Sequence, residues 1–235
     1  RGLATGLITT TSIVHATPAA FVAHQTNRDK YESIAIDMMD VDFNLLIGGG
    51  KKYFERRKSD SFNLINLLSA KGYLVKDYFE VDFNSYKIPA GKKFCYFTAD
   101  GEPLPAMRGR DYLSKATRDG IDFLHIVGTK GFFLTIEAGQ IDWGGHDNVG
   151  EYIVTEMLDF NKAIKDALAF ALKDKTTLII VTGDHETGGF SILPGSEIGK
   201  LNTAFTTKKH TAELIPVFAI GPGAEQFAGI YENTE

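Results

Sequence analysis

The sequence predicts an α/β fold in which helices sandwich a mostly parallel central sheet. Strand-like and helix-like stretches alternate along the 235 residues, and such alternation is typical of parallel sheets that are covered on both faces. The apolar runs have the length of strands, and glycines or prolines punctuate several of them. The length suits a single domain over residues 1–235.

The first elements follow from local composition. Residues 6–13 are rich in β-branched side chains and predict a strand. Thr17 followed by Pro18 is typical of a helix start, because Thr caps the helix and Pro fits its first position, so a helix is expected over residues 18–31. The next predicted elements are a strand over 41–47, stopped by Gly48, Gly49 and Gly50, and a helix over 61–71, closed by Gly72.

The middle of the chain is less regular than either end. Prolines and glycines interrupt short aromatic stretches in residues 73–110, which we expect to form an irregular insertion. The remaining predicted elements are a helix over 112–127, a strand over 132–136, a loop over 137–148, a helix from Asn148 as N-cap to about 172, and strands over 177–181 and 215–220.

Charge and apolar run length exclude two classes of function. The chain has 25 Lys and Arg against 30 Asp and Glu, a formal net charge of −5, whereas nucleic-acid-binding domains are usually basic. No apolar run approaches the roughly 20 residues of a membrane span. Cys95 is the only cysteine, which excludes an intrachain disulfide.

Candidate metal ligands follow the ends of three predicted strands. Glu137 follows one strand, Asp184 and His185 follow another, and His15 and Thr17 follow a third. Ligands of open parallel sheets bind beyond the carboxyl ends of the strands, and imidazole and carboxylate groups are common metal ligands. Together these positions favour a metal centre, although each residue alone is more often a cap, a salt-bridge partner or a surface group.

Two further candidates lie just beyond Glu137. Asp142 and His146 are one helical turn apart, so both side chains can point the same way, and Gly144–Gly145 between them lets the backbone bend close to an ion. No nucleophile motif or phosphate-binding P-loop is present in the sequence. A metal centre is therefore the leading interpretation of the residues themselves.

Short motifs, in order over almost the whole chain, resemble the alkaline phosphatases. They are Ala16–Ala20 with His24 and Arg28, Gly48–Gly50, Glu137–Asp142 with His146, Thr182–Glu186, and His210–Thr211 before Gly221–Pro222. The resemblance implies the fold of that family and hydrolysis of small phosphomonoesters to inorganic phosphate through a phosphoserine intermediate. It also implies two Zn²⁺ and one Mg²⁺, a homodimer, and a periplasmic or secreted location.

The resemblance assigns a role to each candidate. It places Asp142, His146 and His210 on the first zinc, Asp184 and His185 on the second, and Glu137 and Thr17 on the magnesium. Arg28 matches the arginine that clamps the substrate phosphate, since a planar guanidinium can bond two phosphate oxygens. His15 stands where the bacterial prototype has Asp, and we expect it to tune magnesium affinity and phosphate release.

The resemblance also predicts that the chain is incomplete at its N-terminus. In the family, the nucleophilic serine and an Asp that bridges zinc and magnesium precede the segment that matches residue 1. We therefore expect weakened magnesium binding and a sheet edge that is either exposed or paired with another copy of the chain. Whether this chain is active alone stays open. The alternatives are another hydrolase of the superfamily, such as a phosphodiesterase or sulfatase, and a non-catalytic metal-binding fragment.

Overall fold

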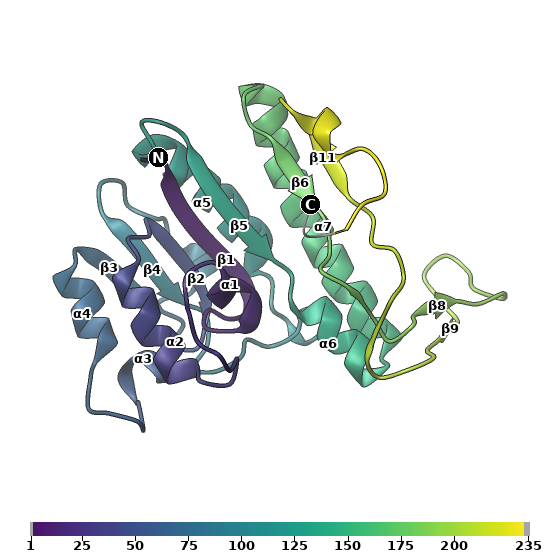
Figure 1. The fold of residues 1–235 in the computed structure, drawn as a ribbon, viewed down its shortest axis with the longest axis horizontal. Helices are drawn as coiled ribbons and strands as arrows, with labels where there is room; N and C mark the ends of the chain where they lie inside the picture. Colours follow the sequence, from purple (N-terminus) through teal and green to yellow (C-terminus); the bar gives the residue numbers. More distant parts are fainter. Residues whose placement is uncertain (1, 233–235) are drawn as a thin grey trace. The chain divides into compact units, whose positions relative to one another are not determined.

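The computed structural model describes residues 2–232 and divides into two compact units (Figure 1). The first unit extends to Gly139 and the second begins at Gln140. The expectation of a single domain over residues 1–235 stays a prediction. Among the described residues, no helix combines the length and the hydropathy that crossing a bilayer requires.

A five-stranded, all-parallel sheet forms the centre of the first unit. Its order is β3-β4-β2-β1-β5, and each neighbouring pair is parallel. The strands are β1 (Ala4–Ser12), β2 (Leu45–Gly49), β3 (Tyr73–Asp77), β4 (Lys93–Phe97) and β5 (Phe132–Glu137). The predicted α/β class with a mostly parallel central sheet is confirmed.

Helices cover both faces of this sheet (Figure 1). Leu7 and Leu46 belong to the apolar cluster that packs against α1–α4. Leu45 and Ile8 face α5 on the other side, where a Cβ on Gly120 would lie 2.8 Å from the Leu45 side chain. The helices are α1 (Ala16–Ala20), α2 (Tyr31–Asp37), α3 (Lys52–Glu55), α4 (Leu64–Ala70) and α5 (Tyr112–Val127), with 3₁₀ turns η1 (Met38–Asp40), η2 (Phe83–Ser85) and η3 (Ala106–Arg108).

The helix predicted over residues 18–31 is much shorter in the structure. Helix α1 ends at Ala20, and the chain turns before α2 begins at Tyr31. The Asp37 carboxylate accepts hydrogen bonds from the backbone N–H of His24 and the side chain of Gln25. These bonds hold the segment in a loop, because a side chain that binds such groups competes with helical pairing.

The range 73–110 is only partly irregular. It contributes β3 and β4 to the parallel sheet, and its prolines and glycines lie in the connections. Phe94, Cys95 and Phe97 are fully buried, which explains why the aromatic stretch forms a strand between two layers. The insertion expected from the turn residues is therefore confined to the connections.

The second unit combines two helices with short antiparallel pairs. Strand β6 pairs with β11, β7 with β10, and β8 with β9. Its elements are α6 (Gln140–Asp147), α7 (Gly150–Asp174), β6 (Ile179–Val181), β7 (Glu186–Thr187), β8 (Ser191–Ile192), β9 (Thr203–Ala204), β10 (His210–Thr211), β11 (Phe218–Ile220) and the 3₁₀ turn η4 (Ala224–Phe227).

Helix α6 occupies a segment that the sequence predicted as a loop. Asn148 follows it with a φ of 56°, a left-handed conformation that Asn tolerates. Val149, rather than Asn148, is the N-cap of α7. The N-cap of α7 was therefore predicted one residue too early in the sequence. Asn148 instead forms the turn that ends α6 before α7 begins.

Candidate metal centre

Three side chains of the second unit converge within reach of one cation. His146 Nε2 lies 3.4 Å from Asp142 Oδ1 and 3.2 Å from His210 Nε2, and His210 Nε2 lies 3.7 Å from Asp142 Oδ1. One ligand atom from each residue lies within 4.8 Å of the others. The structure therefore brings together the three residues predicted to hold one zinc.

Helix α6 and the β7–β10 pair position these three groups. Asp142 and His146 are one turn apart on α6, and His210 pairs with Thr187 across the two short strands. A Cβ on Gly145 would lie 2.5 Å from the Thr187 carbonyl oxygen. The sequence predicted that Gly144–Gly145 bends the backbone close to an ion. In the structure both glycines lie within α6, and Gly145 lets this helix approach β7 closely.

Hydrogen bonds outside the cluster orient the ligand atoms. The Lys208 carbonyl lies 2.7 Å from His146 Nδ1 and can only accept, so Nδ1 carries the proton and Nε2 faces the cluster. The Thr187 hydroxyl donates to Asp142 Oδ1. Groups that hydrogen-bond metal ligands fix the ring orientation and tautomer of those ligands. Their presence here supports a metal site whose ligands are held in position.

His185 and Asp184 lie next to this cluster. The His185 ring stacks on the His210 ring with centroids 3.5 Å apart and an interplanar angle of 17°. His185 Nε2 is 3.1 Å from Asp184 Oδ2. The two residues lie between β6 and β7, outside regular strand structure. Two predicted ligands of a second ion thus neighbour the first group.

The donor set fits a zinc ion with an open coordination position. One carboxylate and two imidazoles provide three protein ligands, as in catalytic zinc sites. The side chains of Asp142, His146 and His210 are 32%, 39% and 45% exposed, so a further ligand can reach the centre from solvent.

Glu186 stabilises the strand pair that carries His210. Its carboxylate accepts hydrogen bonds from the Thr211 hydroxyl and from the backbone N–H groups of Gly189 and Phe190, the last two at 3.0 and 3.1 Å. Burial alone would raise the pKa of Glu186, but the three hydrogen bonds and His185 lower it overall. A lowered pKa in the folded state means that the ionised carboxylate favours folding.

We expect Glu186→Gln to destabilise the second unit by about 1 kcal/mol at neutral pH, since the site is largely open to solvent. The contribution of Glu186 is complete above the pKa of the unfolded chain and is lost as pH falls through the lowered folded pKa. Urea unfolding followed by Trp143 fluorescence measures it, because Trp143 is the only tryptophan. Glu151→Gln on α7 is the control, and an equal loss in both variants would contradict the assignment.

In the first unit, Glu137 meets two threonines that the sequence interpretation missed. Thr9 and Thr11 both donate to Glu137 Oε2, and Thr9 is the register partner of Glu137 on the neighbouring strand. In the sequence, these threonines are typical of an ordinary β-strand. The available signal was that three consecutive threonines at the end of a buried strand are an unusual concentration of polar groups. In the described chain, the side-chain hydrogen bonds of Glu137 come from these two residues rather than from Thr17, whose role stays a prediction.

His15 and Arg28 lie together on the segment that follows β1. His15 Nε2 is 3.5 Å from Arg28 Nη2, although the two residues are separated by α1 and the loop after it. The imidazole can accept a hydrogen bond from the guanidinium in one tautomer. This contact brings the predicted phosphate clamp, Arg28, next to His15, which is predicted to tune magnesium affinity and phosphate release.

Glu102 is a second residue that the sequence interpretation passed over. Its carboxylate accepts a hydrogen bond of 2.5 Å from the backbone N–H of Ser12, at the end of β1. Partial burial raises the pKa of Glu102, Glu137 raises it further, and the Ser12 N–H and Lys52 oppose the shift. Glu102 lies in the stretch expected to be irregular, and nothing in its sequence context signalled this contact.

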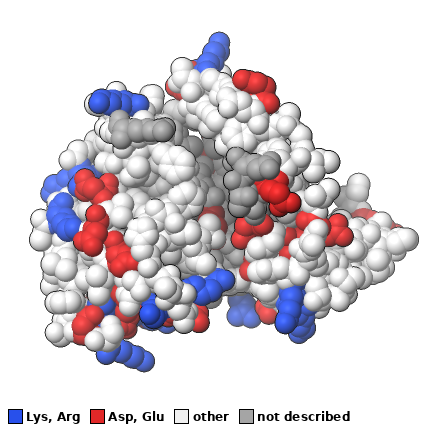
Figure 2. Space-filling model, viewed as in Figure 1, with Lys and Arg blue, Asp and Glu red and all other residues white. Residues whose placement is uncertain are grey.

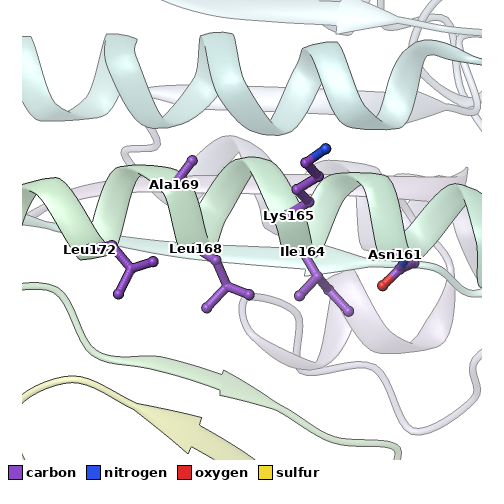
Figure 3. Close-up of a pocket in the computed structure, with 6 residues that line it drawn as sticks. All are labelled: Asn161, Ile164, Lys165, Leu168, Ala169 and Leu172. Atoms are coloured by element: carbon purple, nitrogen blue, oxygen red, sulfur yellow. The ribbon is translucent and has the colours of Figure 1, made fainter.

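A groove along α7 is not the candidate site. It has a volume of about 400 Å³ and is lined mainly by aliphatic groups, with Ile164, Leu168 and Leu172 pointing to the same side (Figure 3). Lys165 is its only titratable lining residue. On the face shown in Figure 2, basic and acidic side chains are interspersed.

Comparisons with known proteins agree with the resemblance. The sequence model of the alkaline phosphatase family matches residues 1–203. Alkaline phosphatase 3 of Bacillus subtilis is 32% identical over all of this chain and 66% of its own length. The alkaline phosphatase of the Antarctic bacterium TAB5 is 42% identical, with a TM-score of 0.90, over 99% of this chain and 69% of that one.

A mutant of the TAB5 enzyme was solved with Mg bound in its M3 site and superposes with a TM-score of 0.88 at 41% identity, over 99% of this chain and 69% of that one. The chain spans about two thirds, 66%, of the length of its Bacillus relative. The family match covers most of the chain and includes all of the sequence motifs except the last. On these grounds the chain belongs to the alkaline phosphatase family.

Proposed function

We propose that this chain forms the metal-binding part of a phosphomonoesterase. The convergence of Asp142, His146 and His210 around one point is the observation that carries the proposal. Membership of the alkaline phosphatase family supports phosphate esters as substrates and inorganic phosphate as product. The phosphoserine intermediate, implied by the resemblance, stays a prediction.

The chain offers ligands for three ions. Zinc is proposed at Asp142, His146 and His210 and at Asp184 and His185, and magnesium at Glu137 and Thr17. The TAB5 variant shows that a relative can hold Mg, and the oxygen ligands of Glu137 and Thr17 suit the preference of Mg²⁺. Bound zinc supplies Lewis-acid charge and activates water at neutral pH.

Arg28 and His15 are proposed to hold the phosphate group. The guanidinium can donate two parallel hydrogen bonds to phosphate oxygens, and it offsets their charge in the transition state. His15, 3.5 Å from Arg28 Nη2, can accept from that nitrogen and limit the rotation of the guanidinium. The pair therefore supplies both positive charge and orientation.

Turnover of three esters tests the reaction class. We expect the full-length protein, loaded with zinc and magnesium, to cleave p-nitrophenyl phosphate but neither bis(p-nitrophenyl) phosphate nor p-nitrophenyl sulfate. His210→Gln should abolish cleavage, and His125→Gln on the exposed side of α5 should not. Preference for the diester or the sulfate would favour another hydrolase, and phosphate binding without turnover would favour a non-catalytic metal-binding chain.

We also propose, from the family resemblance, that the protein is a homodimer and is exported to the periplasm or the medium. Sedimentation equilibrium of the metal-loaded protein tests the first proposal, and a monomer at micromolar concentration would contradict it. Fractionation of the producing cells tests the second.

A further inference from the structure

The Glu102 carboxylate lies against the end of β1, where the turn that carries His15 begins. The loop that follows β4 brings it there. Gly50 donates its backbone N–H to the Gly101 carbonyl at 2.7 Å, and Lys52 donates to the Asp100 carbonyl at 3.0 Å. The residues on either side of Lys51 thus hold the loop against the end of β2.

Gly49 and Gly50 make this close approach possible. A Cβ on Gly49 would lie 2.2 Å from the Gly101 carbonyl oxygen, and a Cβ on Gly50 would lie 2.1 Å from Ser12 Oγ. Gly50 also has a φ of +94°, which side chains other than that of glycine rarely adopt. The glycine triplet, which has no phosphate-binding Lys-Ser/Thr pattern after it, therefore has a packing role: it lets two loops meet at the end of β1.

Ser12 links Glu102 to the candidate phosphate site. The pairing of β1 with β2 shifts register between Ile8 and Ser12, so the end of β1 departs from the regular ladder. His15 donates its backbone N–H to the Ser12 carbonyl at 2.9 Å, and Ala19 donates to the His15 carbonyl at 2.9 Å to start α1. A short chain of hydrogen bonds thus runs from Glu102 to the residue that contacts Arg28.

We propose that Glu102 is a positioning residue for phosphate binding: its carboxylate fixes the backbone of Ser12 and, through it, the turn that places His15 against Arg28. The inference rests on the proposed function, in which Arg28 and His15 hold phosphate. Glu102 touches neither of them through its side-chain hydrogen bond, and it acts on the backbone between β1 and α1.

Binding of inorganic phosphate to the zinc- and magnesium-loaded protein, measured by calorimetry, is the test. Glu102→Ala removes the acceptor of the Ser12 N–H, and we expect phosphate affinity to fall about tenfold. Glu102→Gln keeps an oxygen that can accept the same bond, so it should bind phosphate within about twofold of the unchanged protein. Asp100→Ala, two residues away and paired with Arg56 at the surface, is the control and should bind normally.

Two further measurements separate positioning from general loss of structure. Hydrogen exchange of residues 12–20 should accelerate in Glu102→Ala while exchange in β3 and α5 is unchanged. Gly49→Ala, which forces the Gly101 carbonyl away with Glu102 still present, should weaken phosphate binding like Glu102→Ala. If Glu102→Ala fails to fold, phosphate binding by Gly49→Ala is the measurement that tests the proposal.

The inference is overturned if Glu102→Ala, or in its absence Gly49→Ala, binds phosphate normally. It is also overturned if Glu102→Gln binds as weakly as Glu102→Ala, because charge rather than the hydrogen bond would then be responsible. Failure of the unchanged protein to bind phosphate has a different meaning, since it would overturn the proposed function itself.

Discussion

Replacing Asp142 by Asn is expected to lower the zinc affinity of the protein by about 100-fold or more. Loss of a residue that only hydrogen-bonds a metal ligand costs about 10–100-fold in affinity, and Asp142 is itself a proposed charged ligand. Asn preserves the size of the side chain but leaves two imidazoles as the only strong ligands of the cluster. Competition with a chromophoric chelator measures the change directly. Phosphatase activity should fall in parallel.

Asp147→Asn is the matched control for this experiment. Asp147 ends the same helix, α6, and is exposed, outside the three-residue cluster. Both variants lose one negative charge, so a general electrostatic effect on zinc would appear in both. Zinc affinity that falls equally in the two variants would show that Asp142 is not a ligand.

Replacing Arg28 by Lys is expected to weaken phosphate binding and to lower kcat/KM by about 100-fold, the scale on which preorganised donors to a developing anion contribute. Lys keeps the positive charge but cannot donate two parallel hydrogen bonds from a rigid plane. The loss therefore measures geometry rather than charge. Steady-state turnover of p-nitrophenyl phosphate gives kcat/KM, and competition by inorganic phosphate gives the phosphate affinity.

Arg118→Lys on the exposed side of α5 controls for a general arginine effect, and it should change neither value. Zinc affinity should also be unchanged in Arg28→Lys, since Arg28 is not a proposed ligand. Normal phosphate binding by Arg28→Lys would leave electrostatic attraction as the whole contribution of this residue and would contradict the proposed clamp.

Sequence periodicity predicted the elements whose packing is local. Helix α5 spans the expected residues, 112–127, because its apolar residues recur at helical spacing along its whole length. Helix α6 was missed, since two glycines within eight residues resemble a loop in composition. Only its packing partner, the Thr187 backbone, explains why Gly145 belongs in a helix.

In the candidate site, too, the residues alone predicted the contacts that are local in the chain and missed those between distant segments. The spacing of Asp142 and His146 indicated a shared direction, and the structure shows both in the cluster. His210 is 64 residues from His146, and the residues alone carried no signal that β10 would bring it there. Thr9 was missed because its partnership with Glu137 depends on the register of two strands that are distant in sequence.

A single hydroxyl couples the two ion sites proposed in the second unit. The Thr187 oxygen contacts both Asp142 Oδ1 and, at 3.1 Å, His185 Nδ1. Since threonine has one proton to donate and gives it to Asp142, it must accept from His185, which leaves the His185 Nε2 lone pair available to a cation. We therefore expect the two proposed sites to bind zinc cooperatively, because a ligand of each site is held by the same hydroxyl. Zinc titration of Thr187→Val should show weaker coupling between the two binding steps than in the unchanged protein, and equal coupling in both would contradict this role of Thr187.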